Sequence, residues 1–180
     1  MKKILLIFII LILIHGCSQK QLNENDKTLD SGGTKMEIIS NNFKHDQDIP
    51  SKFTCQGENI RPHLKWSEFP RGTKSFAISV LDPDAPRGTF VHWLIYNIPA
   101  SVTELEEGLE IPKGAIEVAN DAGKKQFIGP CPPSGKHRYF FKVYALNVDK
   151  LSGINSDNFI QKIEENSIES AEIIGLYQKK

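Results

Sequence analysis

Residues 81–93 read LDPDAPRGTFVHW, and this stretch determines how the strongest predicted strands of the chain are joined. Proline fixes φ and forces the residue before it into an extended conformation, so the DPDAP segment cannot be helical. Runs rich in β-branched and aromatic residues flank this segment at Ser75–Val80 and Val91–Tyr96, which predicts a strand on each side. Neighbouring strands joined in this way place Asp82 and His92 at the same end of a sheet.

The rest of the chain has the pattern of further short strands between turns. We expect strands at Met36–Ser40, Pro62–Trp66, Tyr139–Leu146 and Glu169–Tyr177, with short strands near Leu105 and Ile116 inside an irregular excursion. Within Pro62–Trp66, alternation puts His63 and Lys65 on the face opposite Leu64 and Trp66.

One helix is expected late in the chain. Asp157 is its predicted cap, and Phe159, Ile160 and Ile163 fall on one face. Many short strands, long loops and one short C-terminal helix predict a mainly β fold, an antiparallel β-sandwich.

The N-terminus has the layout of a secretory signal. Lys2 and Lys3 precede the unbroken apolar run Ile4–Ile14, which is too short to span a bilayer as a helix. Gly16 and Cys17 follow, and a small residue before a cysteine resembles a bacterial lipobox. We therefore predict a signal peptide over residues 1–16 and a diacylated Cys17 as the first mature residue. The alternative is an ordinary cleaved signal followed by a chance cysteine.

Residues 17–35 form a predicted tether, because a nearly all-polar segment cannot bury enough apolar surface to fold. The folded domain is then expected over residues 36–180. A serine directly after the lipidated cysteine fits delivery to the outer membrane of a Gram-negative cell. The predicted location is the bacterial cell envelope, with the domain lipid-anchored and facing the periplasm if the cell is Gram-negative.

Charge and cysteine content narrow the class of protein further. Without Lys2 and Lys3 the 22 basic residues become 20, against 22 acidic ones, and no basic cluster stands out. This balance argues against nucleic acid as a partner. Once Cys17 is acylated, Cys55 and Cys131 remain, and in an exported protein we expect them to form a disulfide. The alternative is two free thiols.

Two proline-stiffened loops carry the candidate site. The first holds Asp82, Asp84 and Pro86 before His92, and the second, GPCPP at residues 129–133, precedes His137 and Tyr139. Stiff loops favour a preformed pocket, because little ordering entropy is then lost on binding. The two histidines can donate hydrogen bonds to an anion, and Asp82 can orient one imidazole and raise its pKa. Singly, each feature is also typical of a packed histidine or a turn, so the prediction depends on their joint occurrence.

The motifs resemble those of the phosphatidylethanolamine-binding protein family, whose bacterial members are called Raf-kinase-inhibitor-like. The resemblance runs from about Met36 to Tyr177. It rests on the motifs FTC at 53–55, GENI at 57–60, PHLKW at 62–66, GTKSF at 72–76, DPDAP at 82–86, HW at 92–93 and HRY at 137–139. It implies an antiparallel sandwich with a small anion pocket at one end. The candidate ligand-binding residues are Asp82, Pro86, His92, Cys131, Pro132, His137 and Tyr139.

These observations predict a binding protein for a small phosphoryl or carboxylate group, without a cofactor. Since the loops are short and stiff, we expect only a small anion to fit. The resemblance also allows a protease inhibitor or another protein-binding regulator, although no reactive loop is identifiable. A metal-dependent enzyme is the third alternative, because Asp82, His92 and His137 have the composition of an iron(II) facial triad. No G-x-S-x-G hydrolase motif is present, and we predict neither a bound metal nor catalysis.

Overall fold

The structure is a computed structural model that describes residues 35–180. The predicted signal peptide, the lipidation at Cys17 and all of the tether before Lys35 lie outside the described residues, so they stay predictions. Within residues 35–180, no helix is long and apolar enough to cross a membrane.

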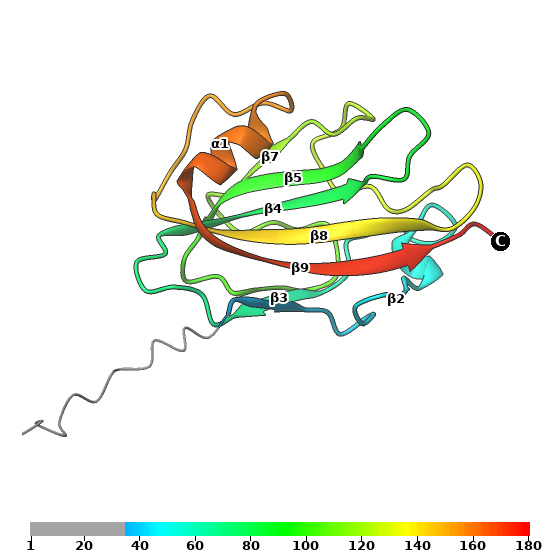
Figure 1. Cartoon of the computed structure of the whole chain (residues 1–180), viewed down its shortest axis with the longest axis horizontal. Helices are drawn as coiled ribbons and strands as arrows, with labels where there is room; N and C mark the ends of the chain where they lie inside the picture. The colour runs from blue at the N-terminus through cyan, green and yellow to red at the C-terminus, as the bar shows by residue number, and fades with distance from the viewer. Residues whose placement is uncertain (1–34) are drawn as a thin grey trace, which may run out of the picture. The chain divides into compact units, whose positions relative to one another are not determined.

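The larger of the two β-sheets contains six strands in the order β2-β9-β8-β4-β5-β7 (Figure 1). All neighbours pair antiparallel except β2, which runs parallel to β9. The strands span β2 Gln47–Asp48, β4 Ser75–Asp82, β5 Phe90–Pro99, β7 Ile116–Val118, β8 His137–Leu146 and β9 Ser167–Tyr177. The long central strands are the ones whose sequences are almost continuously apolar, since both faces of the sheet are covered.

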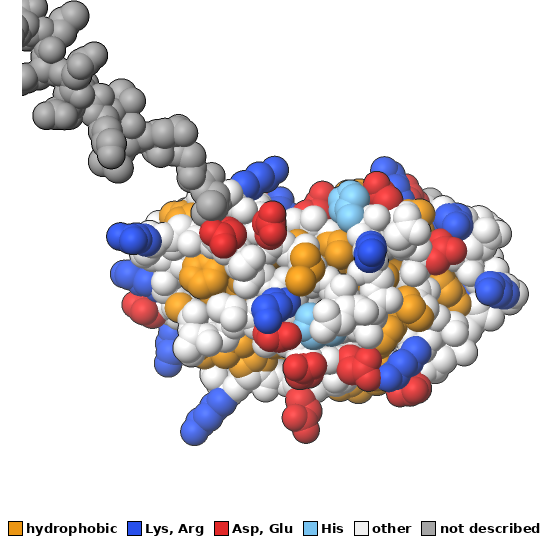
Figure 2. All heavy atoms as spheres, turned by 90° about the horizontal axis from the view of Figure 1, so that it is seen from below, with side chains coloured by type: hydrophobic (Ala, Val, Ile, Leu, Met, Phe, Trp, Pro, Cys, Tyr) orange, Lys and Arg blue, Asp and Glu red, His pale blue; other side chains and the backbone are white. Residues whose placement is uncertain are grey.

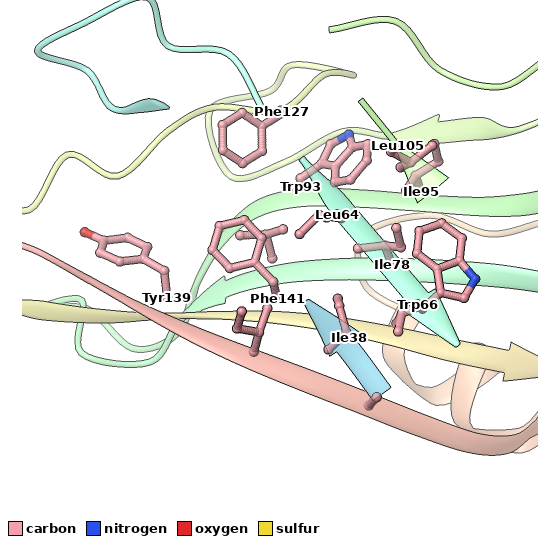
Figure 3. Close-up of a cluster of buried hydrophobic side chains, with 14 of the residues drawn as sticks. Ile38, Leu64, Trp66, Ile78, Trp93, Ile95, Leu105, Phe127, Tyr139 and Phe141 are labelled. Carbon is pink, nitrogen blue, oxygen red and sulfur yellow. The ribbon is translucent and has the colours of Figure 1, made fainter. Parts of the chain in front are cut away.

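The smaller sheet has the order β1-β3-β6 and packs on one face of the larger sheet. Its strands are β1 Glu37–Ile39, β3 Leu64–Ser67 and β6 Glu104–Leu105, and a short 3₁₀ helix follows β2 at Ser51–Phe53. Figure 3 shows Leu64 and Trp66 of β3 among Ile78, Trp93 and Phe141 of the larger sheet. All five side chains are almost completely buried, so the main core lies between the sheets.

The helix α1, Phe159–Asn166, covers the opposite face of the larger sheet (Figure 1). Its Phe159 and Ile163 are buried against that face, and the ring centroid of Phe159 lies 6.4 Å from that of Tyr96. The predicted cap Asp157 is wrong: Asn158 holds the N-cap position and makes no side-chain capping bond. The prediction of a mainly β sandwich with one short C-terminal helix is confirmed.

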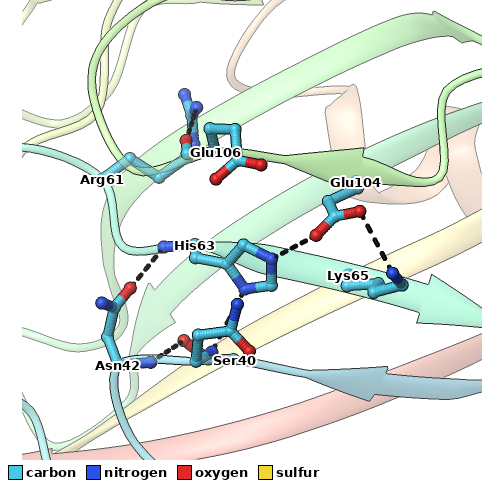
Figure 4. A network of polar contacts seen from close by, with 8 residues as sticks. Ser40, Asn42, Arg61, His63, Lys65, Glu104 and Glu106 are labelled. Carbon is cyan, nitrogen blue, oxygen red and sulfur yellow. Dashed lines mark hydrogen bonds and ion pairs between the residues drawn. The ribbon is translucent and has the colours of Figure 1, made fainter.

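A polar network at the smaller sheet corrects the predicted orientation of His63. The expected alternation placed it with exposed Lys65, yet His63 is only 2% exposed. Its Nδ1 accepts a hydrogen bond from the backbone N–H of Asn41 at 3.1 Å, so Nε2–H donates to Glu104 at 2.7 Å (Figure 4). The backbone N–H of His63 donates to Asn42 Oδ1 at 2.7 Å. This histidine lies just before β3 and ties a loop to the sheet, which strand alternation does not reveal.

Strand register brings four chain segments to one end of the larger sheet. Asp82, the last residue of β4, pairs with Phe90 at the start of β5, and His137 at the start of β8 pairs with Tyr177 at the end of β9. The connections 83–89 and 127–136 therefore flank the same sheet end.

Candidate functional site

A pocket of about 530 Å³ opens at this end of the larger sheet. Its lining includes five of the predicted site residues: Asp82, Pro86, His92, Cys131 and Pro132. The other two predicted residues, His137 and Tyr139, contact these residues from within the protein and are both buried. The structure thus brings all seven residues together, with five at the pocket surface and two behind it.

Asp82 is a buried carboxylate with a fixed set of partners. Its Oδ2 accepts a hydrogen bond from His137 Nδ1 at 2.8 Å, and its Oδ1 accepts one from the backbone N–H of Asp84 at 2.9 Å. The side chains of Asp82 and His137 are 5% and 8% exposed, so the pair is almost fully removed from water. With Nδ1 held by Asp82, the His137 imidazole has a fixed orientation.

The neighbouring Asp84 holds the first loop against β8. Arg138 donates to Asp84 from its backbone N–H at 2.9 Å, from Nε at 2.9 Å and from a terminal nitrogen at 2.7 Å. These hydrogen bonds lower the pKa of Asp84 to about 2. The 83–89 connection is therefore anchored at both carboxylates of the DPD motif.

His92 reaches the pocket through a β-bulge in β5. Val80 pairs with Trp93 but Leu81 pairs with Val91, so His92 is the extra residue between these pairs. Its Nδ1 lies 2.9 Å from the carbonyl oxygen of Ile128, to which an Nδ1–H donates.

Burial determines which charge state of His92 is favoured. Burial lowers the pKa of His92 and outweighs the negative charges of Asp82 and Asp121, which raise it. The neutral imidazole is therefore favoured at His92, whereas the imidazole that Asp82 orients, as expected for one of the two, is that of His137. Since Nδ1–H is used by Ile128, the neutral ring presents the lone pair of Nε2.

Tyr139 lies on the inner side of His92. Their ring centroids are 5.2 Å apart in an edge-to-face arrangement, and the ring centroid of Phe90 lies 5.0 Å from that of His92. Tyr139 is completely buried, yet its hydroxyl has no hydrogen-bond partner among residues 35–180. Burial, followed by the charge of Asp82, raises the pKa of this hydroxyl. A neutral donor is thus left unpaired beside the histidines.

The second wall of the pocket is fastened to the loop after the 3₁₀ helix. The backbone N–H of Gly129 donates to Asn59 Oδ1 at 2.7 Å, and the backbone N–H of Cys55 donates to the Pro130 carbonyl at 3.1 Å. A Cβ at Gly129 would collide with the Phe53 carbonyl oxygen, so only glycine fits this close approach.

A disulfide joins the same two loops. It links Cys55 and Cys131, whose Cα atoms are 5.4 Å apart, a normal separation for a disulfide. The predicted pairing is confirmed. Both cysteines are exposed at the surface, and Cys131 borders the pocket, so the pocket wall is covalently held.

Three residues of the lining with charged or aromatic side chains were not among the predicted site residues. Phe90 and Asp121 line the walls, and Arg87 lies in the lining contributed by the 83–89 connection. Asp121 accepts a hydrogen bond from the backbone N–H of Val91 at 2.7 Å. Arg87 is exposed, and among residues 35–180 it has no ion-pair partner. The position of Arg87 directly after Pro86 was the available signal.

The pocket also differs from the expectation that only a small anion fits. Ligand pockets for drug-sized molecules commonly have volumes of roughly 300–1,000 Å³. The observed 530 Å³ falls in that range.

The iron-triad alternative has no geometric counterpart in the part of the chain that the structure describes. Within residues 35–180, no group of three or more histidine, cysteine, aspartate or glutamate side chains is arranged to hold a metal ion. Asp82 directs both carboxylate oxygens to protein hydrogen-bond donors.

The sequence of the chain matches the model of one known protein family. The sequence model described as "Phosphatidylethanolamine-binding protein" matches residues 39–178, which is most of the chain. The chain belongs to this family. The match covers both loops and every residue of the pocket described above.

Relatives in distant organisms share the domain over almost their whole length. A UPF0098 protein of Aquifex aeolicus is 43% identical over 163 residues, which cover 86% of this chain and 95% of that protein. The UPF0098 protein YbcL of Escherichia coli is 39% identical, with 85% of this chain and 93% of YbcL covered. The crystal structure of E. coli YbcL, titled a new member of the mammalian PEBP family, superposes with a TM-score of 0.76. That superposition covers 81% of this chain and 99% of YbcL, at 37% identity.

Proposed function

We propose that this family member is a binding protein that holds a small phosphoryl or carboxylate group in the pocket, without catalysing a reaction on it. One observation carries the proposal: His92 and His137 each have Nδ1 fixed by an acceptor, Ile128 O and Asp82 Oδ2 respectively. Within residues 35–180, the side-chain hydrogen bonds of these two rings are made by Nδ1 and not by Nε2. Two oriented imidazoles, which donate from Nε2 once that atom carries a proton, and the unpaired Tyr139 hydroxyl are the donors that an anion requires.

The charges around the pocket imply that an anion arrives together with a proton. Asp82 and Asp121 are acidic, Arg87 is the cation in the lining, and burial keeps His92 neutral. A neutral Nε2 accepts rather than donates, so it repels an anion until it is protonated. Binding is therefore expected to raise the pKa of His92.

Nuclear magnetic resonance of the imidazoles tests the proposed site. The protein is titrated with acetate and with phosphoethanolamine while its histidine rings are followed. Saturable shifts are expected at His92 and His137. His63, buried at the smaller sheet, and exposed His45 serve as internal controls. Unmoved signals from His92 and His137 at high ligand concentration would contradict the proposal.

The same titration at several pH values tests the protonation step. Acetate keeps its charge between pH 8 and pH 6, so a change in affinity over this range reports on the protein. For each proton taken up, the affinity is expected to rise by up to about tenfold per unit of falling pH, until His92 is protonated in the free protein. An affinity that is constant from pH 8 to pH 6 would show that the anion binds without the imidazolium.

We further propose that the protein acts in the cell envelope, anchored to the membrane through lipid on Cys17. The exposed Cys55–Cys131 disulfide supports an oxidising compartment, because such bonds are rarely kept in a reducing cytosol. Mass spectrometry of the N-terminal peptide from a membrane fraction tests the anchor. An unmodified Cys17 would leave an ordinary cleaved signal as the better interpretation.

A further inference from the structure

We infer that residues 40–48 form an acid-sensitive strap, which neutral His63 and His45 fasten to the two sheets and which loosens when these imidazoles are protonated. The strap runs from the end of β1 to the end of β2, and none of its residues lines the pocket. Each of the two histidines accepts a hydrogen bond from a backbone N–H of another segment. The strap is therefore separate from the site of the proposed function.

The first fastening joins the start of the strap to the smaller sheet. His63 Nδ1 accepts a hydrogen bond from the Asn41 N–H at 3.1 Å, and Nε2 donates to Glu104 at 2.7 Å (Figure 4). Glu104, which also pairs with Lys65 at 3.2 Å, is the charged group that contacts this ring among residues 35–180. Both ring nitrogens are thus in use, and the bond to Asn41 exists only while the imidazole is neutral.

The second fastening joins the strap to β9 of the larger sheet. His45 Nδ1 accepts a hydrogen bond from the Ile174 N–H at 3.3 Å. His45 Nε2 lies 3.4 Å from Asp46 Oδ2. Asp46 is the charged group that contacts this ring in the described part of the chain, and its charge also reaches Arg138 of β8. This fastening, too, requires an unprotonated Nδ1.

Protonation converts both acceptors into donors. Imidazole is the side chain whose charge ordinarily changes between pH 8 and pH 5. A proton on Nδ1 faces the backbone N–H, so the hydrogen bond is lost. In protonated His63 the bond from Nε2 to Glu104 becomes charge-assisted and keeps the ring beside β6, so the strap moves and the histidine stays.

Other contacts of the strap limit the change to a local opening. Phe43 is buried, and its ring centroid lies 5.3 Å from that of Phe141 in the core. The Asp46 N–H donates to the Ile174 carbonyl oxygen at 2.8 Å, a bond without an imidazole. The expected effect of acid is therefore a more frequent opening of the strap in a domain that stays folded.

Opening of the strap lengthens a free strand edge. Residues 169–174 of β9 pair with β8 alone among the described strands, and β2 in the strap pairs with Gly175 and Leu176 (Figure 1). When the strap opens, these residues and the Ile174 carbonyl lose their partners. An unpaired edge is a template for a strand of another chain, so acid would expose a surface for strand pairing.

Amide hydrogen exchange of the protein at pH 8 and pH 5, followed by nuclear magnetic resonance, tests the inference. Intrinsic exchange rates are divided out, so that protection factors are compared. Protection at Asn41 and Ile174 is expected to fall at least about fivefold at pH 5, because each amide loses its acceptor. The control is the Trp66 N–H of the smaller sheet, which donates to the Thr103 carbonyl at 2.9 Å and should keep its protection. Unchanged protection at Asn41 and Ile174, or an equal loss at Trp66, would overturn the inference.

Two substitutions remove the titration but keep an acceptor. Asparagine presents Oδ1 where histidine has Nδ1, and an amide does not titrate in this range. His63→Asn is expected to remove most of the pH effect at Asn41, and His45→Asn most of the effect at Ile174, so each variant is the control for the other. The side chain of His45 is 56% exposed, so His45→Asn is expected to fold even where exchange of the buried His63 is not tolerated. An undiminished pH effect at Ile174 in His45→Asn would show that another group is responsible and would refute the acid-sensitive strap.

Discussion

Removing the Cys55–Cys131 disulfide should destabilise the domain more than any single loop contact. The bond closes a loop with a sequence separation of 76 residues. Cross-linking a chain over this distance lowers the entropy of the unfolded state, which corresponds to about 4.5 kcal/mol at 25 °C. The free energy of unfolding of the double variant Cys55→Ala, Cys131→Ala is therefore expected to fall by up to that amount.

Two contacts remain between the loops after the bond is removed. The Cys55 N–H still donates to the Pro130 carbonyl, and the Gly129 N–H still donates to Asn59, so the native loop geometry can persist. The loss is then an effect on the unfolded chain, and the pocket should keep its ligand affinity where the variant is folded. With a free energy loss near 4.5 kcal/mol, the melting temperature should fall by roughly 15 °C.

Urea unfolding followed by tryptophan fluorescence measures the effect, with and without reductant. The protein with both cysteines should lose stability in reductant, whereas the stability of the double variant should not change. This comparison controls for the cavity left by the substitutions. A loss below about 1 kcal/mol would refute the loop-entropy argument. Such a result would mean that the unfolded chain already holds the two loops together.

Three further substitutions test the site and its supports. Asp84→Asn should cost about 1 kcal/mol, because its ion pair with Arg138 is partly exposed and screened. That contribution is present above the ordinary pKa of 3.8 and is lost as pH falls towards about 2. Over this pH range, the free energy of unfolding of the variant should therefore fall less steeply than that of the unsubstituted protein. Tyr139→Phe removes an unpaired buried hydroxyl, so the free energy of unfolding should be unchanged or higher by about 1 kcal/mol, while the affinity for an anion falls. The matched control is Tyr144→Phe, which removes a buried hydroxyl that is paired with Ser79. Gly129→Ala should lower the free energy of unfolding by about 2 kcal/mol or more, since its Cβ meets backbone atoms. Chemical unfolding measures the change in the free energy of unfolding for all three substitutions.

Much of the fold was predictable because the long strands have strong local signals. Ser75–Val80 and Tyr139–Leu146 are almost continuously apolar, and both lie at the centre of the larger sheet. The turn between β4 and β5 was predictable for a separate reason, since its prolines exclude helix. Even the short strands β6 and β7 follow the predicted positions near Leu105 and Ile116.

Burial of isolated polar residues was not predictable in the same way. Arg61 is only 2% exposed, and its guanidinium donates to the carbonyl oxygens of Glu106 and Glu110 at 2.6 and 3.1 Å. It lies 5.3 Å from the ring centroid of Trp93, and burial lowers its pKa to about 10. All of these partners are distant in sequence. Composition and periodicity classify an arginine as a surface residue, so only the three-dimensional structure reveals such an anchor.

The orientation of His92 shows most clearly why the site could be predicted only in part. Strict alternation along β5 would put His92 and Trp93 on opposite faces, and Val91 on the same face as Trp93. In the structure Val91 packs with the cluster under α1, whereas Trp93 belongs to the core between the sheets and His92 contacts Tyr139 of that core. The bulge between the pairs Val80–Trp93 and Leu81–Val91 produces this change of face. Since a bulge depends on the partner strand, no local pattern in the sequence encodes it, although the pocket depends on the face that His92 takes.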